Sequence, residues 1–215
     1  VSAACAGFLY AMNIAHDFIR TGQVKHALVI GAEKLSCFLD WEDRATCVLF
    51  GDGAGAVVLS GEAPQTAREP RGVLATYLSS DGRLAKHLYA DGGPSTTGTV
   101  GKVRMNGKEV FRNAVEQISN AVFEVTERAK VSRHEIDWFV PHQANIRIIE
   151  SCAKKLELPE DKIIVTIDRH ANTSSASIPL ALDAGIRDGR IERGQLLVFA
   201  ALGGGLAWGS ALARY

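Results

Sequence analysis

Cysteine is sparse in this 215-residue sequence, and its pattern excludes two classes of protein. The four cysteines, Cys5, Cys37, Cys47 and Cys152, form no C-x-x-C pair and no cluster with histidine. Structural zinc sites need closely spaced Cys and His ligands, and disulfide-built domains are short and rich in cysteine. We therefore expect no metal centre, a fold that does not depend on disulfides, and a cytoplasmic location.

An excess of charge is also missing, and so is any long apolar run. The 24 Lys and Arg residues are balanced by 24 Asp and Glu residues, which gives no indication of a nucleic-acid partner. No apolar run approaches the roughly 20 residues that a membrane span needs, so we expect no membrane association. The initiator Met is absent as well, and because the chain begins at Val1 we expect it to be the later part of a longer protein.

Cys5 lies where a run of small residues meets a helical pattern. Apolar side chains recur at three- and four-residue steps from Phe8 to Ile19, which predicts an amphipathic helix. Unpaired N–H groups and the dipole at a helix start favour a thiolate over a thiol. Cys5 is therefore a candidate nucleophile, and a small buried residue at a tight turn is the alternative.

The rest of the chain alternates short apolar segments with helical patterns, which predicts an α/β fold. Helices are expected at 107–130, 145–156 and 173–187, and strands at 26–32, within 50–60, and at 73–78, 136–141, 196–200 and 206–215. The apolar strand 26–32 is expected to be buried. The glycines at 51–55 precede a strand and lack the G-x-x-x-x-G-K-[ST] pattern, so a nucleotide loop is disfavoured.

An internal repeat relates the two ends of the chain. The segment from Ile19 to Gly22 recurs from Ile186 to Gly189, and each copy lies between a helix and an apolar strand. The offset of 167 residues pairs Cys5 with Asn172. Two duplicated α/β units facing each other would therefore bring Cys5 and Asn172 into one pocket.

His142 follows a predicted buried strand, where α/β proteins place their chemistry. A structural histidine is the alternative, and Asn172 in its polar segment could simply cap a helix. A sulfur, an imidazole and a carboxamide together suit acyl transfer, since the sulfur attacks a thioester and the other two groups stabilise an enolate or oxyanion. The glycines at 203–205 can bring a backbone N–H to the acyl oxygen.

The sequence resembles β-ketoacyl-acyl carrier protein synthase III, the initiating condensing enzyme of bacterial fatty-acid synthesis. The resemblance rests on five segments in family order: Ala3–Phe8, Leu49–Ala56, Pro141–Asn145, His170–Ser174 and Gly203–Gly209. It implies a thiolase-like fold, with duplicated α/β units in α-β-α-β-α layers. Because the first third of a family member is absent, the first unit, at 1–100, should be incomplete, and 101–215 should form the second unit.

The resemblance also implies a reaction and a role for each residue. Cys5 would accept an acyl group from acetyl-coenzyme A or another short acyl-coenzyme A, and condensation with malonyl-acyl carrier protein would follow, without a further cofactor. His142 and Asn172 would stabilise the enolate, and the N–H groups of Cys5 and Gly204 would form the oxyanion hole. Other residues would bind substrate: Phe50 in the acyl pocket, and Arg44, Met105 and Gly107 along the coenzyme A channel.

Partners follow from the same resemblance and from charge. A homodimer is implied, and so is a separate N-terminal segment of the same protein. Arg147, Lys154 and Lys155 fall at seven- and eight-residue steps on one helix face, which an acidic carrier protein would favour, and Arg112 adds to this surface. A solvated helix face is the alternative.

One departure from the family pattern and several alternatives accompany this interpretation. Leu202 stands before the triple glycine, where similar sequences often have Phe, which bears on packing behind His142 and Asn172. A papain-like cysteine protease has the same Cys-His-Asn order, but its C-G-[SA]-C frame is missing. Other Cys-His-Asn condensing enzymes, of polyketide or quinolone type, remain open. An inactive fragment is another possibility, because without its first third the sheet beside Cys5 would expose an apolar face.

Overall fold

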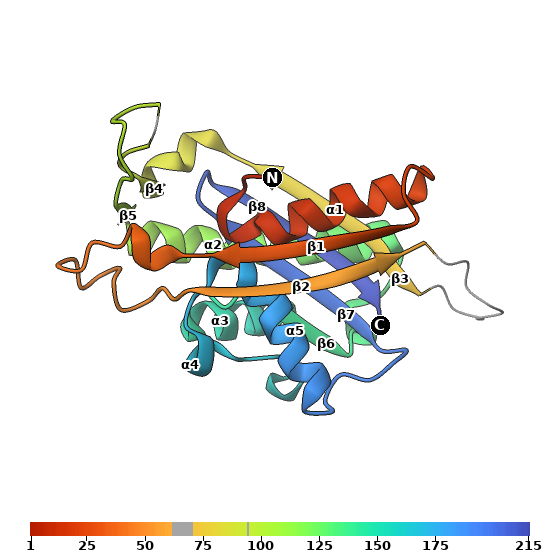
Figure 1. Cartoon of the computed structure of the whole chain (residues 1–215). Coiled ribbons are helices and arrows are strands. Elements are labelled where there is room, and N and C mark those ends of the chain that lie inside the picture. The colour runs from red at the N-terminus through yellow and green to blue at the C-terminus, as the bar shows by residue number, and fades with distance from the viewer. Residues whose placement is uncertain (62–70, 94) are drawn as a thin grey trace.

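The computed structural model describes residues 1–61, 71–93 and 95–215, and Figure 1 shows the order of the elements. The helices are α1 (Gly7–Arg20), α2 (Gly107–Ala129), α3 (Ile146–Leu156), α4 (Ile167–His170) and α5 (Ser177–Arg187). The strands are β1 (His26–Glu33), β2 (Gly53–Ser60), β3 (Gly72–Ser80), β4 (Leu88–Ala90), β5 (Val103–Met105), β6 (Trp138–Pro141), β7 (Leu196–Gly203) and β8 (Ala207–Arg214). None of these helices combines the length and apolarity needed to cross a bilayer.

A four-stranded sheet forms the centre of the molecule, in the order β3-β8-β7-β6. Strand β6 runs parallel to β7, whereas β8 is antiparallel to both of its neighbours. Strands β1 and β2 form a separate antiparallel pair, and β4 and β5 form a short one. Each of the two repeated segments is thus a helix followed by an antiparallel pair of strands: α1 with β1 and β2, and α5 with β7 and β8.

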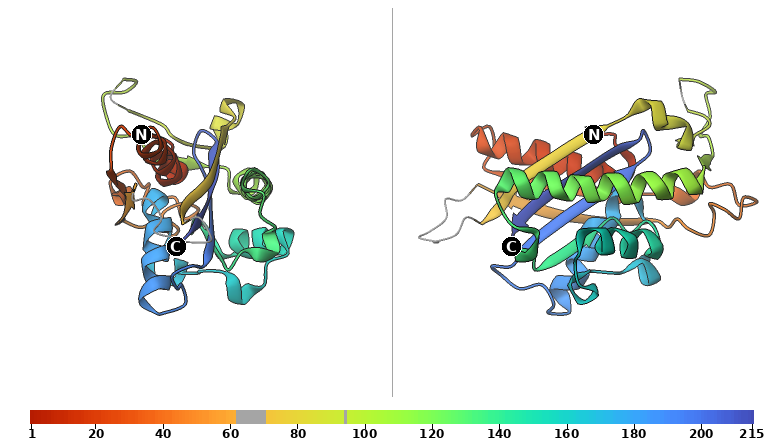
Figure 2. Two further views of the ribbon diagram at one scale, coloured as in Figure 1. Left: turned by 90° about the vertical axis from the view of Figure 1, so that its right-hand side faces the viewer. Right: turned by 180° about the vertical axis from the view of Figure 1, so that it is seen from behind.

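The elements stack in layers. Helix α1 contacts β1 on one side and β7 and β8 on the other, and α5 contacts β2 and β6. Helices α2 and α3 pack on the opposite face of the four-stranded sheet, as the left view of Figure 2 shows. The described residues therefore form a β-α-β-α stack, which is the expected α-β-α-β-α arrangement without one outer helical layer.

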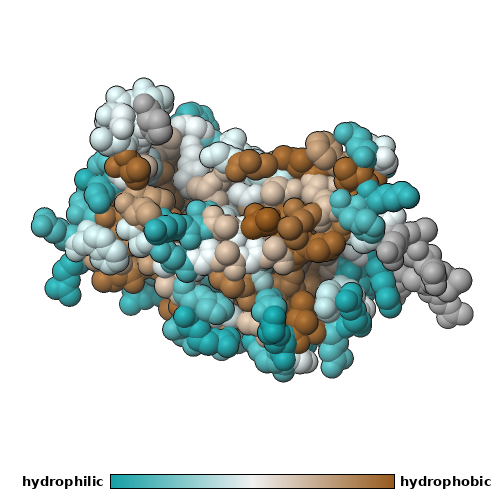
Figure 3. All heavy atoms as spheres, in the orientation of Figure 1, coloured by the Kyte–Doolittle hydropathy of each residue, from teal (hydrophilic) through white to brown (hydrophobic). Residues whose placement is uncertain are grey.

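The outer face of the β1–β2 pair is apolar and uncovered by the described residues. Exposure alternates along both strands, and Leu28 is 62% exposed, Ile30 55% and Val58 68%. Figure 3 shows the resulting apolar surface over this pair and α1. The prediction that the strand at 26–32 is buried is wrong for this chain, because no described residue covers its outer face, and the predicted uncovered apolar face is confirmed.

The two copies of the repeat align with the predicted offset at the ends of α1 and α5, but not at the starts of these helices. A 3-10 turn precedes each helix and contains a residue with positive φ, Ala4 at 45° before α1 and Ser174 at 52° before α5. The turn before α5 lies three residues later in the sequence than an offset of 167 from the turn before α1 predicts. The reason is that α1 has 14 residues and α5 has 11. Cys5 therefore corresponds to Ser175, and its predicted correspondence with Asn172 is wrong.

The sheet does not divide at residue 100. Strand β3 lies within 1–100 but pairs along its whole length with β8, in the sheet of the second unit. The division into 1–100 and 101–215 stays a prediction, and the pairing of β3 favours a boundary before Gly72.

Strand β7 ends against the backbone of the Cys5 turn. A Cβ atom at Gly203 would lie 2.5 Å from the Cys5 backbone nitrogen and 3.0 Å from the Ala3 carbonyl oxygen. Both distances are shorter than van der Waals contact, and backbone atoms cannot move aside as a flexible side chain can. Glycine at this position therefore sets how closely the turn lies on the sheet.

We expect Gly203→Ala to lower the free energy of unfolding by about 1–3 kcal/mol, the usual cost of overpacking a core. Urea denaturation of both proteins measures this change. Gly82→Ala is the matched control, since a Cβ atom at Gly82 meets nothing within 4 Å. Equal stability of the Gly203→Ala and Gly82→Ala proteins would contradict the close approach.

Candidate active site

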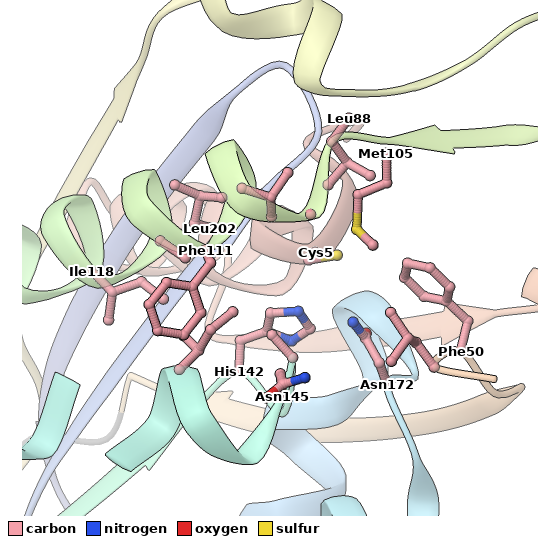
Figure 4. Close-up of a pocket in the computed structure, with 16 residues that line it drawn as sticks. Cys5, Phe50, Leu88, Met105, Phe111, Ile118, His142, Asn145, Asn172 and Leu202 are labelled. Atoms are coloured by element: carbon pink, nitrogen blue, oxygen red, sulfur yellow. The ribbon is translucent and has the colours of Figure 1, made fainter. Parts of the chain in front are cut away.

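A cavity of about 210 Å³ lies where the helix starts meet the four-stranded sheet. Its walls include six residues predicted from the sequence: Cys5, Phe50, Met105, Gly107, His142 and Asn172. In Figure 4 the side chains of Cys5, His142 and Asn172 point toward one another from three separate segments. The structure therefore brings together the nucleophile and the two polar groups, as the sequence predicts.

Cys5 is held in the turn before α1 and is only 7% exposed. Burial raises the pKa of its thiol to about 11, although a hydrogen bond with Ser174 and a backbone hydrogen bond act in the opposite direction. The negative charge of Glu33 raises the pKa further. The backbone at the helix start thus acts on the pKa in the predicted direction, but the cost of desolvating the charge is larger, so the free site holds a thiol and not the predicted thiolate.

His142 follows β6, and its backbone N–H donates to the carbonyl of Ala200 at 2.8 Å, which extends the pairing with β7. Its ring atom Nδ1 lies 2.6 Å from the hydroxyl oxygen of Ser177, the first residue of α5. Burial lowers the pKa of His142 to about 4. The imidazole is therefore neutral at pH 7 and acts through hydrogen bonds rather than charge.

Asn172 is fixed by its backbone and by its side chain. Its N–H donates to the carbonyl of Leu49 at 3.0 Å, and its carbonyl accepts from the N–H of Gly51 at 2.9 Å. Its side-chain oxygen accepts from the N–H of Ser174 at 2.9 Å. Because the oxygen is occupied, the amide NH₂ group faces the cavity, as Figure 4 shows.

The other predicted residues lie at different distances from this cavity. A Cβ atom at Gly204 would be 3.7 Å from that of Ala4, so the glycine turn lies beside the Cys5 turn. Leu202, the departure from the family pattern, lines the cavity. Arg44 is exposed in the turn before Phe50 and is not among the cavity's wall residues.

The basic residues predicted for carrier docking lie outside the cavity. Arg147, Lys154 and Lys155 are exposed on α3. Arg112 lies on α2 and forms an ion pair with Glu109 at 2.7 Å.

Sequence reasoning missed the residues that support the three central side chains. Glu33 ends β1 and accepts hydrogen bonds from the hydroxyls of Ser174, at 3.1 Å, and Ser175, at 2.6 Å. Ser177 contacts His142, and Asn145 lines the cavity. The polar run after Asn172 was the available signal, but its pattern is equally typical of a helix cap.

The arrangement combines a buried thiol with two neutral hydrogen-bond donors. Among residues 1–61, 71–93 and 95–215, no group of His, Cys, Asp and Glu could hold a metal ion. Donors that are fixed before reaction stabilise an oxygen on which negative charge develops. The geometry therefore suits covalent acyl transfer to the sulfur followed by chemistry at a thioester oxygen.

The raised pKa of Cys5 predicts a steep pH dependence of alkylation. Since only the thiolate reacts, the rate of carbamidomethylation at Cys5 should rise about tenfold per pH unit from about pH 7 to 10. Quantitative mass spectrometry of the Cys5 peptide measures this rate, and the exposed Cys37 serves as an internal reference for the reagent. A rate that reaches its plateau below about pH 9 would contradict a thiol pKa of about 11.

Comparison with known proteins matches both ends of the chain to one protein family. The family profile "3-Oxoacyl-[acyl-carrier-protein (ACP)] synthase III" matches residues 1–82, and its C-terminal counterpart matches residues 126–215. The Beta-ketoacyl-[acyl-carrier-protein] synthase III of Sphingopyxis alaskensis is 59% identical over 214 residues, which are 100% of this chain and 66% of that protein. The enzyme of the same name from Rhizobium meliloti is 54% identical over 100% of this chain and 67% of its own length.

A solved structure gives the same result. The 3-oxoacyl-[acyl-carrier-protein] synthase III of Aquifex aeolicus superposes with a TM-score of 0.91 at 47% identity, covering 100% of this chain and 66% of that one. The chain thus spans about two thirds of the length of the relatives it matches. These findings confirm the predicted thiolase-like fold and do not fit a cysteine protease. The chain belongs to the β-ketoacyl-acyl carrier protein synthase III family.

Proposed function

We propose that this chain carries the catalytic residues of a β-ketoacyl-acyl carrier protein synthase III. The enzyme transfers an acyl group from acetyl-coenzyme A, or another short acyl-coenzyme A, to Cys5. It then condenses this group with malonyl-acyl carrier protein and so starts fatty-acid synthesis. The observation that carries the proposal is the meeting of Cys5, His142 and Asn172 in one cavity of a chain with this family membership.

The first step loads the acyl group. The Cys5 sulfur attacks the carbonyl carbon of the acyl thioester, and the bond between that carbon and the coenzyme A sulfur breaks. The thiol proton of Cys5 passes to the departing sulfur, so that coenzyme A leaves as a free thiol. Burial holds the resting Cys5 as a thiol, so its proton must leave as the sulfur attacks, and the backbone hydrogen bond at the helix start, which lowers the pKa, supports this ionisation.

The second step removes carbon dioxide from malonyl-acyl carrier protein. The bond between the carboxylate and the α-carbon breaks, and its electron pair passes to the thioester oxygen as an enolate. The N–H of His142 and the amide NH₂ of Asn172 donate to this oxygen. Both donors are uncharged and already oriented, so they stabilise the developing charge without reorganising.

The third step forms the carbon–carbon bond. The α-carbon attacks the acyl carbonyl on Cys5, and the carbon–sulfur bond breaks as the β-ketoacyl product forms. The Cys5 sulfur then takes a proton from solvent and becomes a thiol again. The backbone N–H groups of Cys5 and Gly204 form the oxyanion hole, which the packing of Gly204 beside Ala4 supports.

Apolar and glycine residues bind the substrates. Phe50 lines the acyl pocket, and its backbone bridge to Asn172, which sets the two residues side by side, supports this role. Met105 and Gly107 line the approach of the pantetheine arm, in keeping with their place in the cavity wall. Arg44 contacts coenzyme A farther out, at the exposed turn that it occupies.

The complete enzyme includes more than these 215 residues. A further N-terminal segment of the same protein packs on the β1–β2 pair, and the exposed side chains of Leu28, Ile30 and Val58 support this placement. The relatives extend beyond the matched region by about a third of their length. The complete enzyme is a cytoplasmic homodimer that uses coenzyme A thioesters as substrates and no further cofactor.

Cys5→Ala tests the nucleophile. The full-length gene product containing this chain should take up label from acetyl-coenzyme A, and the Cys5→Ala protein should take up none, because it lacks the attacking sulfur. Acid-stable label on the digested Cys5 peptide is the measurement, and Cys37→Ala is the control. Equal labelling of the Cys5→Ala and Cys37→Ala proteins would rule out the assignment.

His142→Ala separates loading from decarboxylation. This protein should still load the acetyl group, but release of labelled carbon dioxide from malonyl-acyl carrier protein should fall about a hundredfold or more, as expected for a lost oxyanion donor. Both rates are measured on the same preparation. Retained decarboxylation would remove His142 from the second step.

The exposed basic residues on α3 form the docking surface for the acidic carrier protein. Arg147 is the second residue of α3 and follows Asn145, a residue of the cavity wall, by two positions. A carrier protein docked at Arg147 can therefore reach the site. Lys154 and Lys155 extend this surface along α3. Arg112 contributes less, because Glu109 already neutralises it.

Arg147→Glu should lower kcat/KM for malonyl-acyl carrier protein about tenfold at low salt, because opposite charges steer association. The difference from wild type should shrink as salt screens the charges. Lys25→Glu, an equal charge change in the turn after α1, should leave kcat/KM unchanged. A loss that is the same at all salt concentrations would argue against electrostatic docking.

A further inference from the structure

Ser177 is the side chain that contacts the His142 ring. It is the first residue of α5 and is 1% exposed. Its Oγ atom lies 2.6 Å from Nδ1 of His142 and 3.3 Å from the backbone nitrogen of Gln143. Both contacts are buried, so each donor and acceptor among these three groups must be satisfied locally.

The hydrogen atoms on these groups can be assigned by counting. A serine hydroxyl carries one hydrogen and can accept two hydrogen bonds. The N–H of Gln143 is a donor only, so Oγ of Ser177 accepts from it. Among the described residues, Nδ1 of His142 is the only other hydrogen-bond partner of Oγ, and so the only acceptor for the hydroxyl hydrogen. The hydroxyl therefore donates to Nδ1, which accepts through its lone pair.

The tautomer of His142 follows from this assignment. A neutral imidazole carries one proton, and if Nδ1 is an acceptor the proton is on Nε2. The opposite tautomer would leave the buried Ser177 hydroxyl without an acceptor, at the desolvation cost of an unpaired polar group. The low pKa of His142 agrees with this account, since the ring does not hold a second proton at neutral pH.

Hydrogen bonds of the neighbouring Gln143 hold the backbone beside His142 in place. The side-chain amide of Gln143 donates to the carbonyls of Pro141, at 2.9 Å, and Ile164, at 3.0 Å. Its oxygen accepts from the N–H of Thr166 at 2.8 Å. This buried network holds the backbone that follows β6, from which the His142 ring reaches Ser177.

We propose that Ser177 is a positioning residue that holds His142 in the tautomer with its proton on Nε2, so that the ring faces the cavity only as a hydrogen-bond donor. The catalytic consequence rests on the proposed function. Protonated Nε2 donates to the enolate oxygen, and it has no lone pair with which to take the proton of Cys5. His142 therefore serves decarboxylation and not acyl loading.

The tautomer can be measured without substrate. In protein labelled with ¹⁵N-histidine, long-range ¹H–¹⁵N correlation spectra distinguish a protonated ring nitrogen from an unprotonated one. The chain has six histidines, and the signals of His142 are those lost in His142→Gln. At pH 7 we expect an unprotonated Nδ1 and a protonated Nε2. A protonated Nδ1 in the wild-type protein would overturn the proposal, whatever the activity of the enzyme.

Ser177→Ala tests the role of the hydroxyl. It should shift the His142 signals toward a mixture of tautomers and lower the decarboxylation rate about tenfold, the rate equivalent of one neutral hydrogen bond. Acyl loading should stay the same. Ser210→Ala is the matched control, because it removes another buried hydroxyl, one that donates to the carbonyl of Ala121. It should leave the His142 signals unchanged.

The possible results separate a failure of the role of Ser177 from a failure of the proposed function. An unchanged tautomer in Ser177→Ala would show that the hydroxyl does not set it. An Nε2 proton in a protein without condensing activity would leave the tautomer assignment standing and remove the proposed function. If Ser177→Ala does not fold, the wild-type spectrum alone still decides where the proton lies.

Discussion

The site depends on the contact between two tight turns, one at the start of α1 and one at the start of α5. Each turn holds a non-glycine residue at positive φ, Ala4 in one and Ser174 in the other. Such backbone costs about 1–3 kcal/mol per residue and persists only where the surroundings fix it. Here the close approach of Gly203 fixes the first turn, and the carboxylate of Glu33 holds the second. Each turn is therefore held by a residue from a distant part of the chain, and the thiol lies where the two turns meet.

Burial decides the chemistry of the groups around this contact. It raises the pKa of Cys5 and lowers that of His142, so the free site holds a neutral thiol and a neutral imidazole rather than an ion pair. Neutral groups act through the direction of their hydrogen bonds, and direction is what the buried partners supply. The hydroxyl of Ser177 forms a hydrogen bond with Nδ1 of His142, and the N–H of Ser174 donates to the side-chain oxygen of Asn172. His142 and Asn172 therefore each present a hydrogen-bond donor to the cavity.

The sequence predicted the elements and the three central side chains well, because periodicity and motif order are local signals. It failed where three-dimensional packing decides. The repeat offset was right at Arg20 and Arg187 but wrong at the helix starts, since a difference in helix length is invisible until both starts are seen. The thiolate prediction for Cys5 used the helix start alone and could not weigh desolvation. Ser177 escaped notice because its sequence position is that of an ordinary residue in a helix start.

The uncovered β1–β2 face affects the site through stability rather than geometry. The described hydrogen bonds of the three central side chains are with residues of this chain: Ser177 for His142, and Ser174 for Asn172 and Cys5. Full burial of a Val, Leu or Ile side chain contributes about 1.5–3 kcal/mol. Leu28, Ile30 and Val58 are all more than half exposed, and covering them would add several kcal/mol to a folded state that is typically only about 5–15 kcal/mol below the unfolded one. An outer layer would therefore change how much of the chain is folded more than it would change the site in the folded molecules.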